Sequence, residues 1–376
     1  MPAPTVLDTL ATLIRINSVN PAYHGGVPEE EIARYIEGFF AERSIRTWRQ
    51  EVFPRRPNVI AAIPGRDSSR RLVFEAHMDT APVEGMTIPP LEPRREGGRM
   101  YGRGSCDTKA GLAAMMEALA SVAREGKQPP CEIWLAAAAD EEFSYRGVVK
   151  LREGLTAAGA VVSEPTEMRL ITATKGCVRF KVHTHGKAAH SSKPHLGVNA
   201  VSAMARVILA IEKYCGSLGG RSHPLLGAAT CNIGLISGGT QINVVPENCT
   251  IEIDRRLLPG ETPAGVVDEI RALVAQVPGV EARVDDPMLQ DLPLETRRDE
   301  RIVASAGAVL ADMRLNAEPA GVPYGSDASK LAAVGIPSIV AGPGSIDQAH
   351  AAVEYVDCDQ VEMAAEFYRR VMMAFD

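Results

Sequence analysis

Two stretches of the chain decide its fold: residues 72–79 read LVFEAHMD, and residues 133–142 read IWLAAAADEE. Both begin with an apolar run that lacks the alternation of polar and apolar residues seen in half-exposed strands. Such runs predict strands that are covered on both faces by helices. Between them, residues 109–124 (KAGLAAMMEALASVAR) are rich in alanine, leucine and methionine and predict a helix. This order predicts an α/β fold with a mainly parallel sheet.

The same pattern recurs outside these stretches. An apolar run at residues 158–162 leads into Ser163-Glu164-Pro165, and another at residues 337–341 leads into a Gly-Pro-Gly loop. Near the N-terminus, apolar residues recur at helical spacing with no basic segment before them, which favours an amphipathic helix over a signal peptide. These apolar residues are Leu7, Leu10, Leu13 and Ile14.

The middle of the chain follows a different pattern. Residues 178–185 (VRFKVHTH) and 250–256 alternate polar and apolar residues, as antiparallel strands with one solvated face do. Helical patterns at residues 198–214 and 263–277 separate the strands, so the order is strand, helix, strand, strand, helix, strand. This order predicts a ferredoxin-like α+β domain. We expect it to be an insertion at residues 175–288, between two parts of the α/β domain at 1–174 and 289–376.

Composition excludes several classes of protein. The 376 residues are 45% hydrophobic and 23% charged, which is typical of a folded globular protein. The net charge is −7 and no run is rich in lysine or arginine, so neither nucleic acid nor a membrane surface is an expected partner. The seven cysteines form no C-x-x-C pair and indicate a reducing compartment. No stretch approaches the roughly 20 apolar residues of a spanning helix, so we expect a cytoplasmic protein.

Polar residues follow the predicted buried strands at the points where the strands end. Side chains there lie at the edge of the sheet where open α/β folds bind ligands. Taken singly each is ordinary, because a lone carboxylate before a helix caps it and adjacent glutamates form solvated turns. Together they follow runs too apolar to tolerate uncompensated charge. The set is His77, Asp79, Asp107, Glu141, Glu142, Glu164 and His350.

The residue types in this set predict a metal centre. Imidazole with carboxylate suits Zn²⁺, Co²⁺ or Mn²⁺, and an excess of carboxylates allows one of them to bridge two metals. Two-metal sites of this kind perform hydrolysis. A nucleophilic serine or cysteine hydrolase is disfavoured, because no G-x-S-x-G elbow follows a strand.

The chain resembles the dinuclear zinc amidohydrolases that include acetylornithine deacetylase, succinyl-diaminopimelate desuccinylase, aminoacylase and bacterial glutamate carboxypeptidase. The resemblance covers essentially the whole chain. It is carried, in the family's order, by AHMDT, GRGSCDTKAG, ADEE, SEPTE, GKAAHSSKP, GGTQINVVP, DRRLLPG, YGSDAS and QAH. It implies that the α/β domain is catalytic and that the inserted domain serves as a lid and in dimerisation.

The resemblance also implies a set of metal ligands. Asp107 would bridge two divalent ions, expected to be zinc, with cobalt and manganese as alternatives. His77 and Glu164 would complete one site, and Glu142 and His350 would complete the other.

Further roles follow from the resemblance. Glu141 would be the general base that takes a proton from the attacking water. Asp79 would hydrogen-bond His77 and fix its tautomer. His190, within GKAAHS, would reach the partner subunit's site and stabilise the oxyanion. Arg256 would bind the free carboxylate of the substrate, and Asn243 and the backbone around Gly325 would line the same pocket.

The resulting hypothesis is a homodimeric, metal-dependent hydrolase that cleaves the amide of an N-acyl amino acid. Glutamate at position 164, within SEPTE, favours the acetylornithine deacetylase type over the peptidase branches. A dipeptidase or glutamate-type carboxypeptidase that acts on a short peptide is the alternative. A non-catalytic metal-binding protein of the same fold is disfavoured, because it would have no need of a base such as Glu141.

Overall fold

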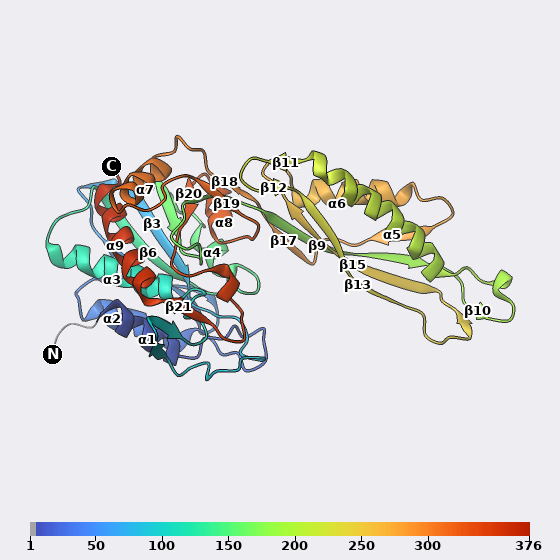
Figure 1. Cartoon of the computed structure of the whole chain (residues 1–376), viewed down its shortest axis with the longest axis horizontal. Coiled ribbons are helices and arrows are strands. Elements are labelled where there is room, and N and C mark those ends of the chain that lie inside the picture. Colours follow the sequence, from blue (N-terminus) through green and yellow to red (C-terminus); the bar gives the residue numbers. More distant parts are fainter. Residues whose placement is uncertain (1–4) are drawn as a thin grey trace. The chain divides into compact units, whose positions relative to one another are not determined.

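The computed structural model describes residues 5–376, which form two compact units (Figure 1). The first unit contains the residues up to Thr172 together with Thr296–Ala320 and Ser326–Asp376. The second unit contains Ala173–Glu295 and the short segment Gly321–Gly325. The second unit is therefore inserted into the chain of the first.

A mixed sheet of nine strands contains both of the stretches that decide the fold. The strands are β1 (Arg46–Phe53), β2 (Arg56–Ile63), β3 (Asp67–His77), β6 (Cys131–Ala138), β7 (Gly159–Val162), β8 (Ile171–Thr174), β18 (Leu294–Glu295), β19 (Ala320–Val322) and β20 (Ser338–Val340). They lie in the order β1-β2-β6-β3-β7-β20-β8-β18, and β19 pairs with β8.

The centre of this sheet is parallel and its edges are antiparallel. β6, β3, β7 and β20 run parallel, which confirms the predicted α/β fold. Pairing is antiparallel from β1 through β2 to β6 on one side, and from β20 through β8 to β18 on the other. Leu72, Val73 and Phe74 in β3 are fully buried, as predicted for a strand covered on both faces.

Helices surround the central strands. They are α1 (Val6–Arg15), α2 (Glu30–Ala41), α3 (Lys109–Glu125), α4 (Arg146–Leu151), α7 (Arg301–Asp312), α8 (Ala328–Ala332) and α9 (Cys358–Ala374). α1 begins with a capping box between Thr5 and Asp8, and its four predicted apolar residues are all buried. α3 is buried on nearly every side, because it packs against β3, β6, α1 and α9 (Figure 1). A small antiparallel sheet joins β4 (Arg94–Glu96), β5 (Arg99–Tyr101) and β21 (Tyr355–Asp357).

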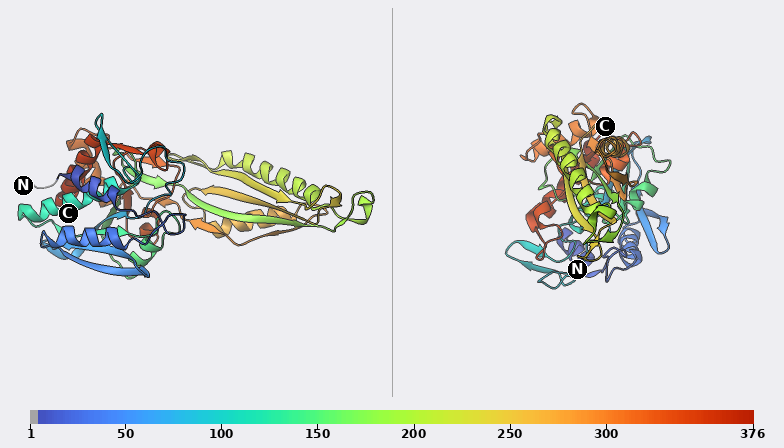
Figure 2. Two further views of the ribbon diagram at one scale, coloured as in Figure 1. Left: turned by 90° about the horizontal axis from the view of Figure 1, so that it is seen from below. Right: turned by 90° about the vertical axis from the view of Figure 1, so that its right-hand side faces the viewer.

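The second unit has the predicted ferredoxin-like order. Its elements are β9 (Gly176–His185), α5 (Ala200–Ser217), β13 (Thr230–Gly238), β15 (Asn248–Leu257), α6 (Pro263–Ala275) and β16 (Glu281–Val284), with β17 (Leu289–Asp291) added beside β9. The antiparallel sheet has the order β13-β15-β9-β16. Both helices run along this sheet (Figure 2). Alternate residues of β9 and β15 join the helices in one core, which explains the period-two pattern of the sequence.

Short elements complete this unit. They are β10 (Ala189–His190), β11 (Ser222–His223), β12 (Gly227–Ala228), β14 (Val244–Val245), and the 3₁₀ turns Pro194–Leu196 and Leu218–Gly220; a third 3₁₀ turn, Ile346–Gln348, belongs to the first unit. Within residues 5–376, no helix combines the length and the apolar character that crossing a bilayer requires.

Candidate metal centre

The predicted metal ligands meet at the carboxyl ends of the parallel strands in the first unit. His77 is the last residue of β3, Glu141 and Glu142 follow β6, and Glu164 follows β7. Asp107 lies in the loop that precedes α3. His350 comes after β20 and a 3₁₀ turn. The βα alternation thus brings together side chains that are far apart in sequence, as expected at this edge of a parallel sheet.

Asp107 lies between two histidines. Its Oδ1 is 3.1 Å from His77 Nε2, and its Oδ2 is 3.4 Å from His350 Nε2. The two oxygens of one carboxylate therefore face two separate imidazoles. This is the arrangement expected of a carboxylate that bridges two metal ions.

Two groups of side chains could each hold a metal ion. In one, ligand atoms of His77, Glu141 and Glu164 lie within 4.8 Å of one another, and in the other the same holds for His77, Asp107 and Glu142. His350 Nε2 lies 3.1 Å from Glu142 Oε2, which adds an imidazole to the second group. Within residues 5–376, no hydrogen-bond partner reaches the buried Glu142 Oε1. A buried carboxylate oxygen without a partner is costly, and a cation would satisfy it. The donor set therefore fits a metal.

The charges of the cluster shift the pKa values of its members. Burial disfavours a charged His77, but its hydrogen bond with Asp107 and the nearby Glu141 outweigh burial and raise the pKa of His77 well above its usual range. Hydrogen bonds with Asp107 and Glu142 raise the pKa of His350 to about 10. Burial, reinforced by Glu164, raises the pKa of Glu141 well above its usual range. Without a metal, the surroundings of these three groups therefore favour their protonated forms.

Metal binding to the metal-free protein is expected to release protons and to tighten as pH rises. Because the pKa values of His77 and His350 are raised, both imidazoles are protonated below those values and must lose a proton before they can bind a cation. Affinity should therefore rise from about pH 6 to about pH 8. Calorimetric titration with Co²⁺ in buffers of different ionisation heat counts the protons released. A proton count of zero would contradict this prediction.

Asp79 anchors the loop that carries Glu141 and Glu142. Its Oδ1 accepts a hydrogen bond from the main-chain N–H of Glu141, and its Oδ2 accepts one from that of Glu142, both at 3.1 Å. Asn20 Nδ2 donates to the same Oδ2 at 2.7 Å. The contact predicted between Asp79 and His77 is made by the main-chain oxygen, which lies 2.8 Å from His77 Nδ1, whereas the carboxylate Oδ1 is 3.6 Å away. The carboxylate therefore acts mainly on the Glu141–Glu142 loop.

A buried polar network behind this loop was not predicted from the sequence. Asn20 Nδ2 also donates to Asp140 Oδ1 at 3.0 Å, and Arg56 joins Asp140 to the fully buried Glu29. These residues come from separate segments of the chain, so nothing in a local pattern links them. These contacts hold Asp140, the residue before the predicted base, in place.

A second buried carboxyl pair lies beside the cluster. Glu75 is two residues before His77 in β3, and its buried carboxyl lies close to that of Asp327, the residue before α8. Burial and the proximity of Asp327 raise the pKa of Glu75 well above its usual range, so the pair is expected to share a proton. A sequence signal did exist here, because Glu75 is a lone charge within an apolar run.

The predicted residues of the second unit fall into two groups. His190 in β10 pairs with Val244 of β14, and the N–H of Ser191 donates to the main-chain oxygen of Asn243 at 3.0 Å. His190 and Asn243 are therefore neighbours, and both are exposed. His190 Nδ1 lies 2.8 Å from Ser192 Oγ.

Arg256 and Gly325 form the other group. Cys177 in β9 is paired with Arg256 on one side and with Asp291 on the other. Gly325 abuts Asp291 so closely that an added Cβ would lie 1.9 Å from Asp291 Oδ2, so a larger residue there would displace the Asp291 side chain. Arg256 Nε donates to Asp254 Oδ1 at 2.9 Å. Arg255, the residue before Arg256, is fully buried and forms an ion pair with Glu261.

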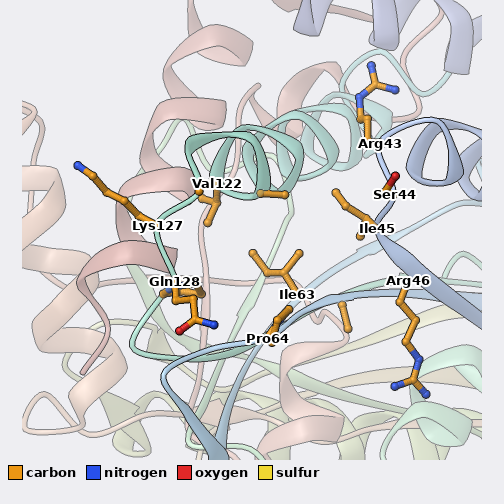
Figure 3. A pocket seen from close by; sticks show the side chains of 13 residues that line it. Arg43, Ser44, Ile45, Arg46, Ile63, Pro64, Val122, Lys127 and Gln128 are labelled. Carbon is orange, nitrogen blue, oxygen red and sulfur yellow. The ribbon is translucent and has the colours of Figure 1, made fainter.

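A cavity of about 450 Å³ in the first unit contains none of the predicted site residues (Figure 3). Ile45, Ile63 and Val122 point toward its middle, whereas the side chains of Arg43 and Arg46 extend away from it (Figure 3). Its lining residues include no histidine, aspartate, glutamate or cysteine, the side chains that bind metals in proteins. The metal centre is therefore the better candidate for the functional site.

Known proteins resemble this chain over its whole length. An acetylornithine deacetylase from Myxococcus xanthus is 29% identical over 388 aligned positions, which cover 99% of this chain and 98% of that protein. The crystal structure of aminopeptidase PepT from Bacillus cereus has a TM-score of 0.82 at 22% identity and covers 98% of both chains. A dinuclear metal-binding peptidase from Bacillus subtilis has a TM-score of 0.73 at 16% identity, covering 98% of this chain and 96% of that one.

A family match agrees with these similarities. Residues 73–374 match the family described as Peptidase family M20/M25/M40. The matched range contains every residue of the candidate metal centre, from His77 to His350. Because it spans most of the chain, the protein belongs to Peptidase family M20/M25/M40 and is a metallohydrolase of the deacetylase or peptidase type.

Proposed function

We propose that the protein is a dinuclear metal-dependent amidohydrolase that cleaves the acyl group from an N-acyl amino acid. The observation that carries this proposal is Asp107, whose two oxygens face His77 and His350, with Glu141 beside them. The likeness to an acetylornithine deacetylase along the whole chain supports a deacylase. Zinc is the expected metal, and cobalt and manganese suit the same ligands.

The roles of the residues follow from the donor set. His77 and Glu164 would hold one ion, Glu142 and His350 the other, and Asp107 would hold both. The bound ions would supply Lewis acids that lower the pKa of water and polarise the amide carbonyl. Glu141 would take the proton of the attacking water and pass it to the leaving amine. Burial favours the protonated form of Glu141, which suits a group that must carry a proton between two steps.

Arg256 is proposed to bind the α-carboxylate of the substrate. A guanidinium pairs with a carboxylate through two parallel hydrogen bonds. Asp254 accepts hydrogen bonds from Arg256 Nε and from Arg179 Nε, so it fixes the orientation of Arg256. Its single negative charge does not neutralise both guanidinium groups. A net positive charge remains for an anionic ligand. The backbone at Gly325, close to Arg256 through Asp291, would line the same pocket.

Replacing Arg256 with alanine is expected to raise KM only for substrates that have a free α-carboxylate. A charged hydrogen bond of this kind contributes about 1.5–3 kcal/mol, which corresponds to a loss of about 10- to 150-fold in kcat/KM. Steady-state kinetics on an N-acyl amino acid and on its α-carboxamide measures the difference. An equal loss on both substrates would refute this role of Arg256.

We further propose that the protein acts as a homodimer. β15 has Asn248 at one end and Arg256 near the other. His190 pairs with β14, which lies at the Asn248 end. Eight residues of extended strand span about 26 Å. His190 and Arg256 of one copy are therefore too far apart to touch one small substrate, and two copies could supply one each. β13 is an edge strand with exposed Leu235 and Ile236, which suits pairing with a second copy. Sedimentation equilibrium would measure the mass.

A peptidase is the alternative within the same chemistry. The aminopeptidase and the metal-binding peptidase named above share the fold, and a peptide bond is also an amide. The substrate would then be a dipeptide or a short peptide with a free carboxylate. The domains at residues 1–174 with 289–376 and at residues 175–288 would serve as catalytic domain and lid in either case.

None of the seven cysteines, all in the described part of the chain, forms a disulfide, which suits a cytoplasmic location.

A substrate panel tests the proposal. Protein loaded with Zn²⁺ or Co²⁺ is offered N-acetyl, N-succinyl and N-formyl amino acids alongside dipeptides, with a chelated sample as control. Release of amine from one acyl class, only with metal present, would support the deacylase. Activity confined to dipeptides would support the peptidase instead. Metal-loaded protein that cleaves nothing in the panel would refute the proposed activity.

A further inference from the structure

We propose that Glu354 and Arg103 are positioning residues that set the separation of Asp107 and His350, and thereby the affinity of the second metal site. This inference rests on the proposed dinuclear function. Glu354 lies four residues after His350 and is fully buried. It was not among the residues predicted from the sequence.

Glu354 holds the loop that ends in Asp107. Its Oε1 accepts the main-chain N–H groups of Cys106, at 2.8 Å, and of Asp107, at 3.0 Å. Its Oε2 accepts the N–H of Gly104 at 3.0 Å. One carboxylate thus takes three main-chain donors from a single loop, and the last of them belongs to the bridging residue itself. The position of the Asp107 main chain depends directly on Glu354.

Arg103 extends this connection to the loop after β3. Its Nη1 donates to Glu354 Oε2 at 2.6 Å. Its Nε and Nη2 donate to the main-chain oxygen of Pro82 at 3.1 and 2.7 Å. Arg103 is 2% exposed, so this ion pair is formed almost entirely out of water. The buried pair of Glu354 and Arg103 therefore joins three segments of the chain. One ends in Asp107, one follows Asp79, and one contains His350.

The arrangement requires a carboxylate. Glu354 has four donors around two acceptor oxygens and places no hydrogen of its own among them. Glutamine has the same shape but would present an NH₂ group to one pair of donors. It would also leave the Arg103 guanidinium buried without a counter-charge, which is strongly unfavourable. The loop would then have to move, and Asp107 with it.

The two proposed metal sites depend on Glu354 unequally. In the site of Asp107, Glu142 and His350, two ligands depend on Glu354. Asp107 lies in the loop that Glu354 holds, and His350 lies in the same segment as Glu354. The site of His77, Asp107 and Glu164 has only one such ligand. A displaced loop should therefore weaken the His350 site first. A merely structural ion pair would lower stability without this asymmetry.

The test is a Co²⁺ titration of chelator-treated protein, followed by calorimetry and by visible absorption. Wild type is expected to bind two ions. In Glu354→Gln the second ion should bind about 10- to 100-fold more weakly, as is typical when a partner of a ligand is lost. With two equivalents of Co²⁺ added, the visible absorption of Glu354→Gln should resemble that of the wild type with one equivalent. Glu354→Asp, which keeps the charge, should recover part of the affinity.

Glu261→Gln is the matched control. Glu261 in the second unit also accepts a guanidinium, from Arg255 at 2.6 Å, and a main-chain N–H, from Leu258 at 2.8 Å. Glu261→Gln should bind both ions like wild type, even if its melting temperature falls.

Wild type that binds no Co²⁺ would overturn the proposed function. Wild type and Glu354→Gln that bind two ions equally would overturn only this inference. Should Glu354→Gln fail to fold, Arg103→Lys is titrated instead, and an unchanged second site would overturn the inference.

Discussion

Replacing Glu141 with glutamine is expected to lower kcat by about 10²- to 10⁴-fold while both metals stay bound. Glutamine keeps the shape of the side chain but cannot accept the proton of the attacking water. Burial and, after it, the neighbouring carboxylate of Glu164 raise the pKa of Glu141, so the neutral variant avoids both the cost of a buried charge and the repulsion from Glu164. The loss should therefore concern turnover and not folding.

Two measurements test this expectation together. Steady-state kinetics on the best substrate of the panel gives kcat, and elemental analysis after gel filtration gives the metal content. Glu142→Gln is the matched comparison, because it makes the same change in the adjacent residue, which we propose is a ligand. It should lose metal, whereas Glu141→Gln should not. If Glu141→Gln turned over substrate at the wild-type rate, Glu141 would not be the base.

Replacing Asp107 with alanine is expected to abolish binding of both metals, and with it all activity. Asp107 Oδ1 faces His77 and its Oδ2 faces His350, so the substitution would take a ligand from each proposed site. It also leaves the buried His77 without the hydrogen bond that raises its pKa, and this lowers the pKa of His77 toward its usual range. The remaining imidazoles cannot compensate, because each serves a different site.

Metal content and calorimetry with Zn²⁺ measure this effect. Asp285→Ala is the control, since Asp285 Oδ2 also lies 2.8 Å from an imidazole, that of His183, but in the second unit. That variant should bind metal like wild type. An Asp107→Ala protein that still bound two ions tightly would contradict the bridging role.

Much of the fold follows from local sequence patterns. The runs at residues 72–76 and 133–139 are apolar without alternation, and they form β3 and β6 in the parallel centre of the sheet. The alternation at residues 178–185 and 250–256 reflects the two faces of β9 and β15. The antiparallel edge formed by β1 and β2 was not predicted, because pairing direction depends on the chain path and not on residue periodicity.

The candidate site divides in the same way. The seven residues predicted at strand ends stand next to strong local signals, and the structure brings all of them to one edge of the sheet. Asn20 and Glu354 act through contacts with residues 59 and 248 positions away, such as Asp79 and Cys106. A buried hydrogen bond between distant segments has no periodicity, so only the three-dimensional structure could identify these supporting residues.

The path of the chain around the second unit has a consequence for how such enzymes diversify. The chain leaves the large sheet after β8 and returns in β18, and these strands are antiparallel neighbours with Leu294 opposite Thr174. Ends this close allow a segment to be gained, lost or exchanged with little disturbance of its host. The seven residues proposed for metal binding, base and support all belong to the host. Selection on the insertion could therefore change substrate preference or subunit assembly while the hydrolytic chemistry is inherited intact.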